Sequence, residues 1–126
     1  MKALFYSLTA VTALAAGNAY AACSYPTAPE ALPDGNTATL EEMVAAQKTV
    51  KEFDAAITAY TACLKLESDS TIAKIDQSDP KKADAQKKDL ERMQIQKHNA
   101  AVEADEALAT RFNEQLKTFK AKSKKS

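Results

Sequence analysis

The first half of the chain repeats its apolar residues at intervals that alternate between three and four residues. This spacing makes a heptad seam, the pattern of a coiled coil. The seam consists of Met43, Ala46, Val50, Phe53, Ile57, Tyr60 and Leu64. It predicts a helix over residues 39–76, which opens with a capping box because Thr39 and Glu42 have the T-x-x-E spacing.

The second half carries a longer apolar stripe with a mean interval of about 3.6 residues, the period of a straight amphipathic helix. The stripe, which includes one lysine stem, consists of Leu90, Met93, Lys97, Ala101, Ala104, Leu108, Phe112, Leu116 and Phe119. It predicts a helix over residues 80–120, with Asp79 as the N-cap and Pro80 in the first turn. Similar lengths and a short connection predict an all-α fold of two long antiparallel helices, a helical hairpin.

Residues 22–38 form a different kind of segment, a proline-rich arm. Pro26, Pro29 and Pro33 exclude a regular helix, and the sequence from Pro33 to Asn36 is typical of a turn. We therefore expect an extended arm, then a hairpin domain over residues 39–120, then a basic tail over residues 121–126.

An antiparallel arrangement predicts specific contacts between the two helices. Phe112 and Phe119 should face the start of the first helix, from Met43 to Phe53. Tyr60 should face the stretch from Ala101 to Leu108. The seam is weak near the connection, so residues 67–88 should be the least stable part of the hairpin.

Residues 1–21 have the pattern of a secretory signal peptide. Lys2 precedes an apolar run over residues 3–16, and Ala19-Tyr20-Ala21 has small residues where signal peptidase requires them. An uncleaved membrane anchor is the alternative, although hydroxyl side chains interrupt the run. The pattern predicts a periplasmic or secreted protein.

The chain has two cysteines, Cys23 and Cys63. In an oxidising compartment they should form a disulfide, and closing a loop of about 40 residues should add roughly 4 kcal/mol to the stability. Lipidation of Cys23 is one alternative, but it would leave Cys63 without a partner, and Tyr20 stands where lipoprotein signals usually carry an aliphatic residue. Two free thiols are the other alternative.

Charge is divided unevenly between the two halves. Residues 22–80 carry 10 Asp and Glu against 4 Lys, and residues 81–126 carry 12 Lys and Arg against 7 Asp and Glu. Opposite signs favour an antiparallel pairing of the halves, although each exposed ion pair contributes only a few tenths of a kcal/mol.

No group of residues has the form of an active site. His98 is the single histidine, and we expect it to be an exposed polar residue rather than a metal ligand. The adjacent carboxylates Glu41-Glu42 and Asp105-Glu106 lack the cleft that would raise the pKa of a general acid. The sequence therefore predicts no enzyme, no catalytic residue, no metal and no cofactor.

The end of the chain is rich in lysine. These residues, candidates for contact with an anionic surface, are Lys117, Lys120, Lys122, Lys124 and Lys125. The alternative is a solubilising tail whose cations suit the negative end of a helix dipole. A nucleic-acid partner is not expected for an exported protein.

The run from Arg111 to Glu114 suggests structural roles. We expect Arg111 to pair with Glu42 or Asp54 of the first helix, and Asn113 to hydrogen-bond the backbone of the arm.

Several segments together resemble a family of small exported, periplasmic proteobacterial helical proteins of unknown function. These segments are Cys23–Pro26, Pro33–Thr39, Met43–Gln47, Val50-Lys51, Tyr60–Leu64, His98–Glu103 and Ala109–Gln115. The resemblance covers nearly all of the chain after residue 21, and the paired cysteines with the proline-rich arm are its best-defined feature. It implies an extracytoplasmic hairpin, and it transfers no catalytic residue.

These observations favour a non-enzymatic binding or structural protein of the cell envelope. Its partner would be an envelope protein or an anionic polymer, with weak contact to a membrane surface as a further expectation. The alternative is a periplasmic holdase-type chaperone or adaptor, which would need an oligomer or an exposed apolar groove.

Overall fold

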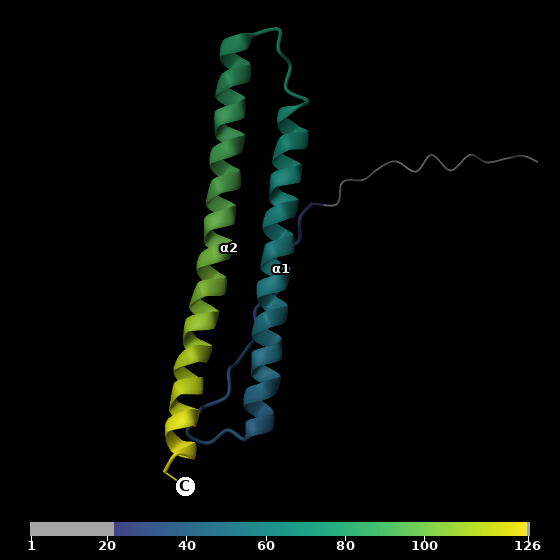
Figure 1. Cartoon of the computed structure of the whole chain (residues 1–126). Coiled ribbons are helices and arrows are strands. Elements are labelled where there is room, and N and C mark those ends of the chain that lie inside the picture. The colour runs from purple at the N-terminus through teal and green to yellow at the C-terminus, as the bar shows by residue number, and fades with distance from the viewer. Residues whose placement is uncertain (1–21, 126) are drawn as a thin grey trace, which may run out of the picture.

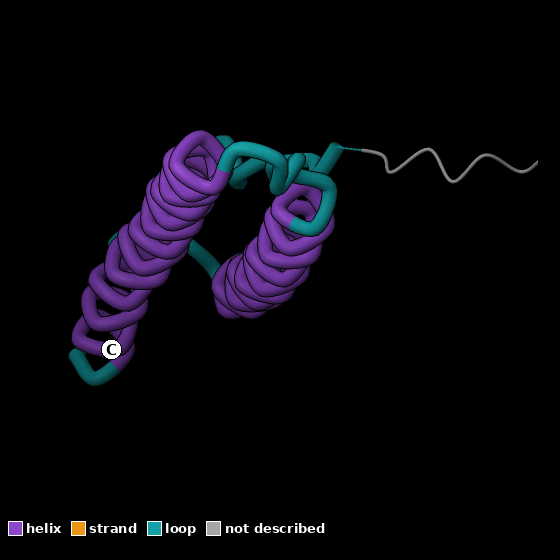
Figure 2. Tube along the Cα trace, turned by 90° about the horizontal axis from the view of Figure 1, so that it is seen from above, coloured by secondary structure: helices purple, strands orange, loops and turns teal. Residues whose placement is uncertain are grey.

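The computed structural model describes residues 22–125, and these form two helices, α1 (Leu40–Ile72) and α2 (Pro80–Ser123). The helices lie side by side and run in opposite directions (Figure 1). Viewed from above, the same two helices and their loops make up the whole described molecule (Figure 2). The predicted antiparallel hairpin is confirmed, while the predicted signal peptide, residues 1–21, lies outside the described residues.

Both helices begin where the sequence predicted, because their first turns are capped. The Thr39 hydroxyl accepts a hydrogen bond from Glu42 N at 3.2 Å, and Glu42 Oε2 accepts one from Thr39 N at 2.7 Å. The Asp79 carboxylate accepts hydrogen bonds from Lys81 N and Lys82 N, each at 3.2 Å. Caps of this kind satisfy amide donors that have no partner within the helix.

The helices end at other residues than predicted. α1 stops at Ile72 rather than near Asp76, and α2 continues to Ser123 rather than to about residue 120. The Asp76 carboxylate accepts hydrogen bonds from the backbone N and the hydroxyl of Ser78, at 2.9 and 2.8 Å, which holds a turn instead of a helix. At the other end nothing breaks α2, so residues 121–123 of the predicted tail are helical.

The core is a narrow apolar seam in two clusters. The first contains Phe53, Ile57, Ala101 and Leu108, with Tyr60 packed against it. The second contains Ala38, Met43 and Phe112, with Ala46, Val50, Leu116 and Phe119 packed against it. The predicted register is therefore confirmed, since Phe112 and Phe119 meet Met43, and Tyr60 meets the cluster of Ala101 and Leu108.

The arm returns along the hairpin, and Leu32 touches both clusters. Its turn presses against α2: Gly35 N donates a hydrogen bond to Gln115 Oε1 at 2.9 Å. A Cβ atom at Gly35 would collide with the backbone carbonyl of Gln115 and lie 2.9 Å from Phe119 N. Glycine is needed here for close approach.

The residue of α2 that bonds the arm is Gln115, so the prediction for Asn113 was wrong. Which side chain of α2 bonds the arm depends on the rotation of α2 about its axis. That rotation places Gln115 beside the turn and leaves Asn113 exposed.

The ion pairs within the two helices do not join one helix to the other. Within residues 22–125, five ion pairs join side chains three or four residues apart in one helix, and none of these five crosses to the other helix. Arg111 is exposed and pairs with neither Glu42 nor Asp54 in this part of the chain, so that prediction was wrong. Glu42 is instead held by its cap. The apolar seam therefore carries the fold.

Candidate functional site

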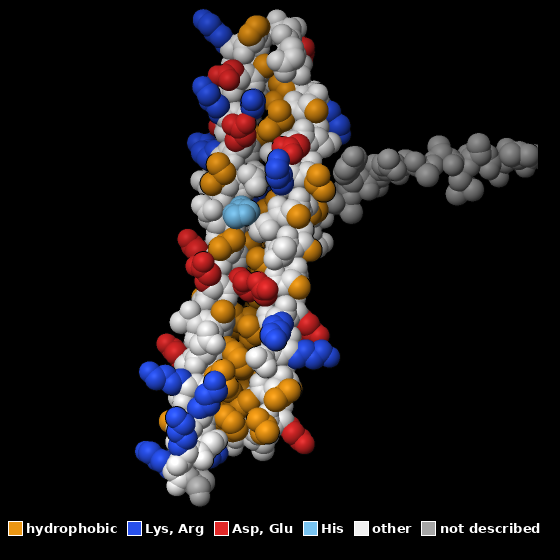
Figure 3. Space-filling model, viewed as in Figure 1, with side chains coloured by type: hydrophobic (Ala, Val, Ile, Leu, Met, Phe, Trp, Pro, Cys, Tyr) orange, Lys and Arg blue, Asp and Glu red, His pale blue; other side chains and the backbone are white. Residues whose placement is uncertain are grey.

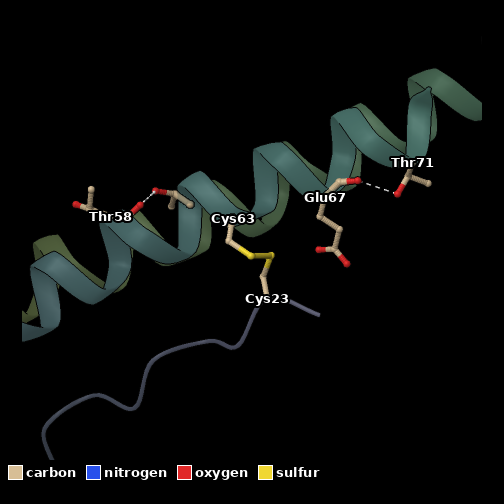
Figure 4. Close-up of a disulfide and its surroundings, with 6 residues drawn as sticks. Cys23, Thr58, Cys63, Glu67 and Thr71 are labelled. Carbon is tan, nitrogen blue, oxygen red and sulfur yellow. Dashed lines mark hydrogen bonds between the residues drawn. A yellow bond between two sulfur atoms is a disulfide. The ribbon is translucent and has the colours of Figure 1, made fainter. Parts of the chain in front are cut away.

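The arm is tied to α1 by the predicted disulfide. Cys23 and Cys63 are bonded, with their Cα atoms 5.8 Å apart (Figure 4). Because the bond uses both thiols, a lipidated Cys23 and a pair of free thiols do not describe this structure. The bond is compatible with a protein that resides outside the cytoplasm.

An aromatic pair accompanies the disulfide, and it was not predicted. The rings of Tyr25 and Tyr60 meet edge to face, with centroids 5.2 Å apart and planes at 79°. Each tyrosine lies within three residues of a bonded cysteine, and this proximity is the signal that could have revealed the pair. The arm is thus held near Cys23 by the disulfide and the rings, and at Gly35 by Gln115 and close packing.

His98 lies at the edge of the interhelical seam and is half-buried rather than exposed as predicted. The physical reason is the width of the inward face of α2, since His98 stands one turn before Ala101, which is completely buried. Among residues 22–125 no three His, Cys, Asp or Glu side chains lie close enough together to hold a metal ion.

A carboxyl pair joins the helices, and sequence analysis missed it. Burial raises the pKa of Asp105, and a hydrogen bond to Asp54 together with the charges of Asp54 and Glu106 raises it further. Asp105 Oδ1 is buried and has no hydrogen-bond donor. The important partner of Asp105 is therefore Asp54 on the other helix. Chemically, the pair can hold a proton between two carboxyl groups.

The five predicted lysines gather at the C-terminal end of α2, and we call Lys117, Lys120, Lys122, Lys124 and Lys125 the lysine end. All five are exposed, and no Asp or Glu occurs from residue 115 onward. Figure 3 shows Lys and Arg side chains collected on α2 at this end of the molecule.

Two shallow hollows flank the lysine end. One of about 520 Å³ is lined by Lys117, Lys120 and Lys124 together with Asn113, Leu116 and Ala121. The other, of about 530 Å³, is lined by Lys117, Lys122 and Lys125 together with Asn36, Thr118 and Ala121. Lysine is the only charged residue in either lining, so both hollows suit an anionic group.

A third hollow, of about 640 Å³, lies between the helices beside the loop of residues 73–79. Ile75, Leu90 and Met93 contribute its apolar lining. A smaller hollow of about 130 Å³ shares Leu90 and Met93 and reaches Leu64. We call these two hollows together the tip groove. Hydrophobic side chains show between the helices in this half of the molecule (Figure 3).

No protein-family model, curated protein or solved structure matches this chain. The resemblance to small exported proteobacterial proteins therefore stays a prediction. Neither helix of the described part of the chain is apolar enough over a sufficient length to cross a membrane.

Proposed function

We propose that this chain is a non-enzymatic binding protein of the cell envelope, and that its lysine end docks onto an anionic polymer or surface. The observation that carries the proposal is the pair of lysine-lined hollows on the two flanks of α2. A multivalent anion that meets this end of the molecule would contact cations on both flanks.

Helical spacing explains why both flanks are cationic. Lys117, Lys120 and Lys124 recur at intervals of three and four residues and so share one side of the helix. Lys122 and Lys125 occupy another side. The whole set spans about 12 Å along the axis, and neighbouring lysines of the set are separated along it by less than the Debye length of about 8 Å at physiological salt. The charges therefore act together on a partner.

Two observations support a place outside the cytoplasm. The Cys23–Cys63 disulfide is of the kind that persists in oxidising compartments. The sequence of residues 1–21 has the order of a secretory signal peptide. We therefore propose that the protein is periplasmic or secreted.

The positions of Asp105 and His98 support a function without catalysis. Asp105 and His98 are both at the edge of the seam, and neither lines the tip groove or the hollows of the lysine end.

Retention on immobilised polyphosphate and on vesicles with anionic lipid tests the proposal. Changing Lys120, Lys122, Lys124 and Lys125 to Gln should weaken binding by at least about a hundredfold, since each lysine near an anionic surface contributes about 1 kcal/mol. The matched control changes Lys81, Lys82, Lys87 and Lys88 to Gln, which removes the same charge at the loop end of α2.

The control variant should bind like the unmodified chain, and binding should weaken as salt is raised. Equal binding by the two variants would refute the lysine end as the site, and would favour a solubilising role for these residues.

The tip groove favours a second candidate function, a periplasmic holdase-type chaperone or adaptor. Met93 is 47% exposed in the groove, so an apolar segment of a client would find a surface there. We rank this function second because the rim of the groove is strongly charged, with both signs present.

A further inference from the structure

The tip groove is the unfinished part of the apolar seam. On α1, buried residues mark the seam from Met43 to Leu64. Between residues 65 and 100, Ala83 alone is buried. Leu90 continues the same stripe but is only half-buried, and Met93 is 47% exposed. Within residues 22–125, apolar surface in register with the core is thus left uncovered toward the loop.

The arm does not reach this surface. Tyr60, Cys63 and Glu67 follow one row of α1, at intervals of three and four residues. The arm contacts the first two of them, through Tyr25 and Cys23. Glu67 already lines the tip groove, and its side chain points to the same side of α1 as Cys63 (Figure 4). The groove therefore begins where the arm ends.

The rim of the groove carries both signs of charge. Lys74, Asp76 and Asp79 of the loop region stand on it together with Lys82 and Asp89 of α2. Two copies related by a twofold axis present the same patch to each other, so each sign must find its opposite within that patch. A mixed rim meets this condition, whereas a rim of one sign would repel its own copy.

We propose that a second copy of this chain covers the tip groove, through a twofold axis that passes beside Met93. The two loop ends then form a short four-helix arrangement, in which helices from both copies bury Leu90 and Met93. This inference does not depend on the proposed function.

The dimer has a consequence for binding. When the twofold axis is perpendicular to the helices, pairing at the loop ends leaves the two lysine ends at opposite ends of one longer rod. If the lysine end binds anions as proposed above, a long anionic polymer would engage both ends with avidity.

Sedimentation equilibrium of the purified, disulfide-bonded chain over a wide concentration range tests the dimer. Met93→Glu should raise the dimer dissociation constant by about a hundredfold, because it buries a charge against the partner. The matched control is Leu66→Glu, since Leu66 is 68% exposed and lines none of the hollows. A second variant, Met93→Ala, keeps a good helix former and should weaken the dimer by about tenfold.

A dimer that dissociates on Met93→Glu and Met93→Ala but not on Leu66→Glu would support the proposal. An unmodified chain that stays monomeric at every concentration would overturn the proposal. A dimer whose dissociation constant is unchanged by the Met93 variants, or is raised as much by Leu66→Glu, would also overturn it. A monomer that prevents a denatured client from aggregating, and loses this property with Met93→Glu, would assign the groove to clients instead.

Discussion

At the scale of single residues, two contacts with α2 residues affect the stability of the fold in opposite directions. Gly35 allows the turn of the arm to lie against the backbone of α2 at Gln115. Asp105 brings a carboxyl group to the edge of the seam beside Asp54, where its Oδ1 receives no hydrogen bond. The first contact is satisfied and stabilises the fold, whereas the second leaves a buried acceptor unsatisfied at a cost.

The Asp105 carboxyl should make stability depend on pH. Burial raises its pKa above the ordinary 3.8, so the folded chain keeps a proton that the unfolded chain has lost. The free energy of unfolding should therefore fall as pH rises from about 4 through the raised pKa, and then level off. Asp105→Asn should remove this fall and raise the free energy of unfolding at neutral pH, by less than the roughly 1–3 kcal/mol of a fully buried unsatisfied group because Asp105 is only half-buried.

Urea unfolding followed by circular dichroism between pH 3 and pH 8, roughly the range in which carboxyl groups titrate, measures the effect. Glu103→Gln removes an exposed carboxyl of the same helix that is not among the charges acting on Asp105, and it serves as the control. Parallel pH profiles for Asp105→Asn and the unmodified chain would show that Asp105 titrates as it does in the unfolded state.

At the scale of elements, each helix is set at its start by a cap, while the arm is held by a covalent bond. The caps at Thr39 and Asp79 act within three residues of chain. The disulfide acts across a sequence separation of 40 residues. The arm contributes only Leu32 and Ala38 to the packed clusters, so it has little apolar surface with which to hold itself in place.

Removal of the disulfide should therefore destabilise the molecule strongly. Changing Cys23 and Cys63 to Ser should lower the free energy of unfolding by roughly 4 kcal/mol, because the unfolded chain regains the entropy of an open loop. Thermal unfolding followed by circular dichroism measures this change. The reduced unmodified chain should behave like the variant, and an unchanged midpoint in both would mean that the arm is held by its noncovalent contacts alone.

At the scale of the whole molecule, the hairpin is a thin rod whose packing is uneven along its length. Buried residues of both clusters occupy the half that contains the arm, and the half that contains the loop has an open groove. A second copy or another apolar partner would complete the weaker half. The lysine end and the tip groove lie at opposite ends of the rod.

Amide hydrogen exchange should report this unevenness. Amides of residues 67–75 and 83–93 should exchange faster than those of residues 50–57 and 101–112, because fewer apolar contacts must break to expose them. If the dimer forms, exchange in the first two segments should slow as the chain concentration rises, while exchange near Phe112 stays unchanged. Uniform protection along both helices would contradict the uneven packing.

Neighbouring residues along the chain were enough to predict the two amphipathic helices, their caps at Thr39 and Asp79, and the proline-rich arm. Apolar spacing also predicted the register that brings Phe112 to Met43, and the presence of two cysteines predicted the bond between them. The helices and their register depend on the helical period, and the caps depend on hydrogen bonds within a few residues. The disulfide could be predicted because each cysteine has only one other cysteine to bond with. The lysine end was likewise visible as a run of cations, but its two hollows were not.

Packing of one element on another decided the remainder. The partners Gln115 for Gly35, Asp54 for Asp105 and Tyr60 for Tyr25 all depend on how far each helix is rotated about its own axis. Neighbouring side chains of a helix differ by about 100° in direction, so a small rotation exchanges a buried residue for an exposed one. The periodicity defines the inward face only broadly, and it did not show that Leu90 and Met93 would line an open groove.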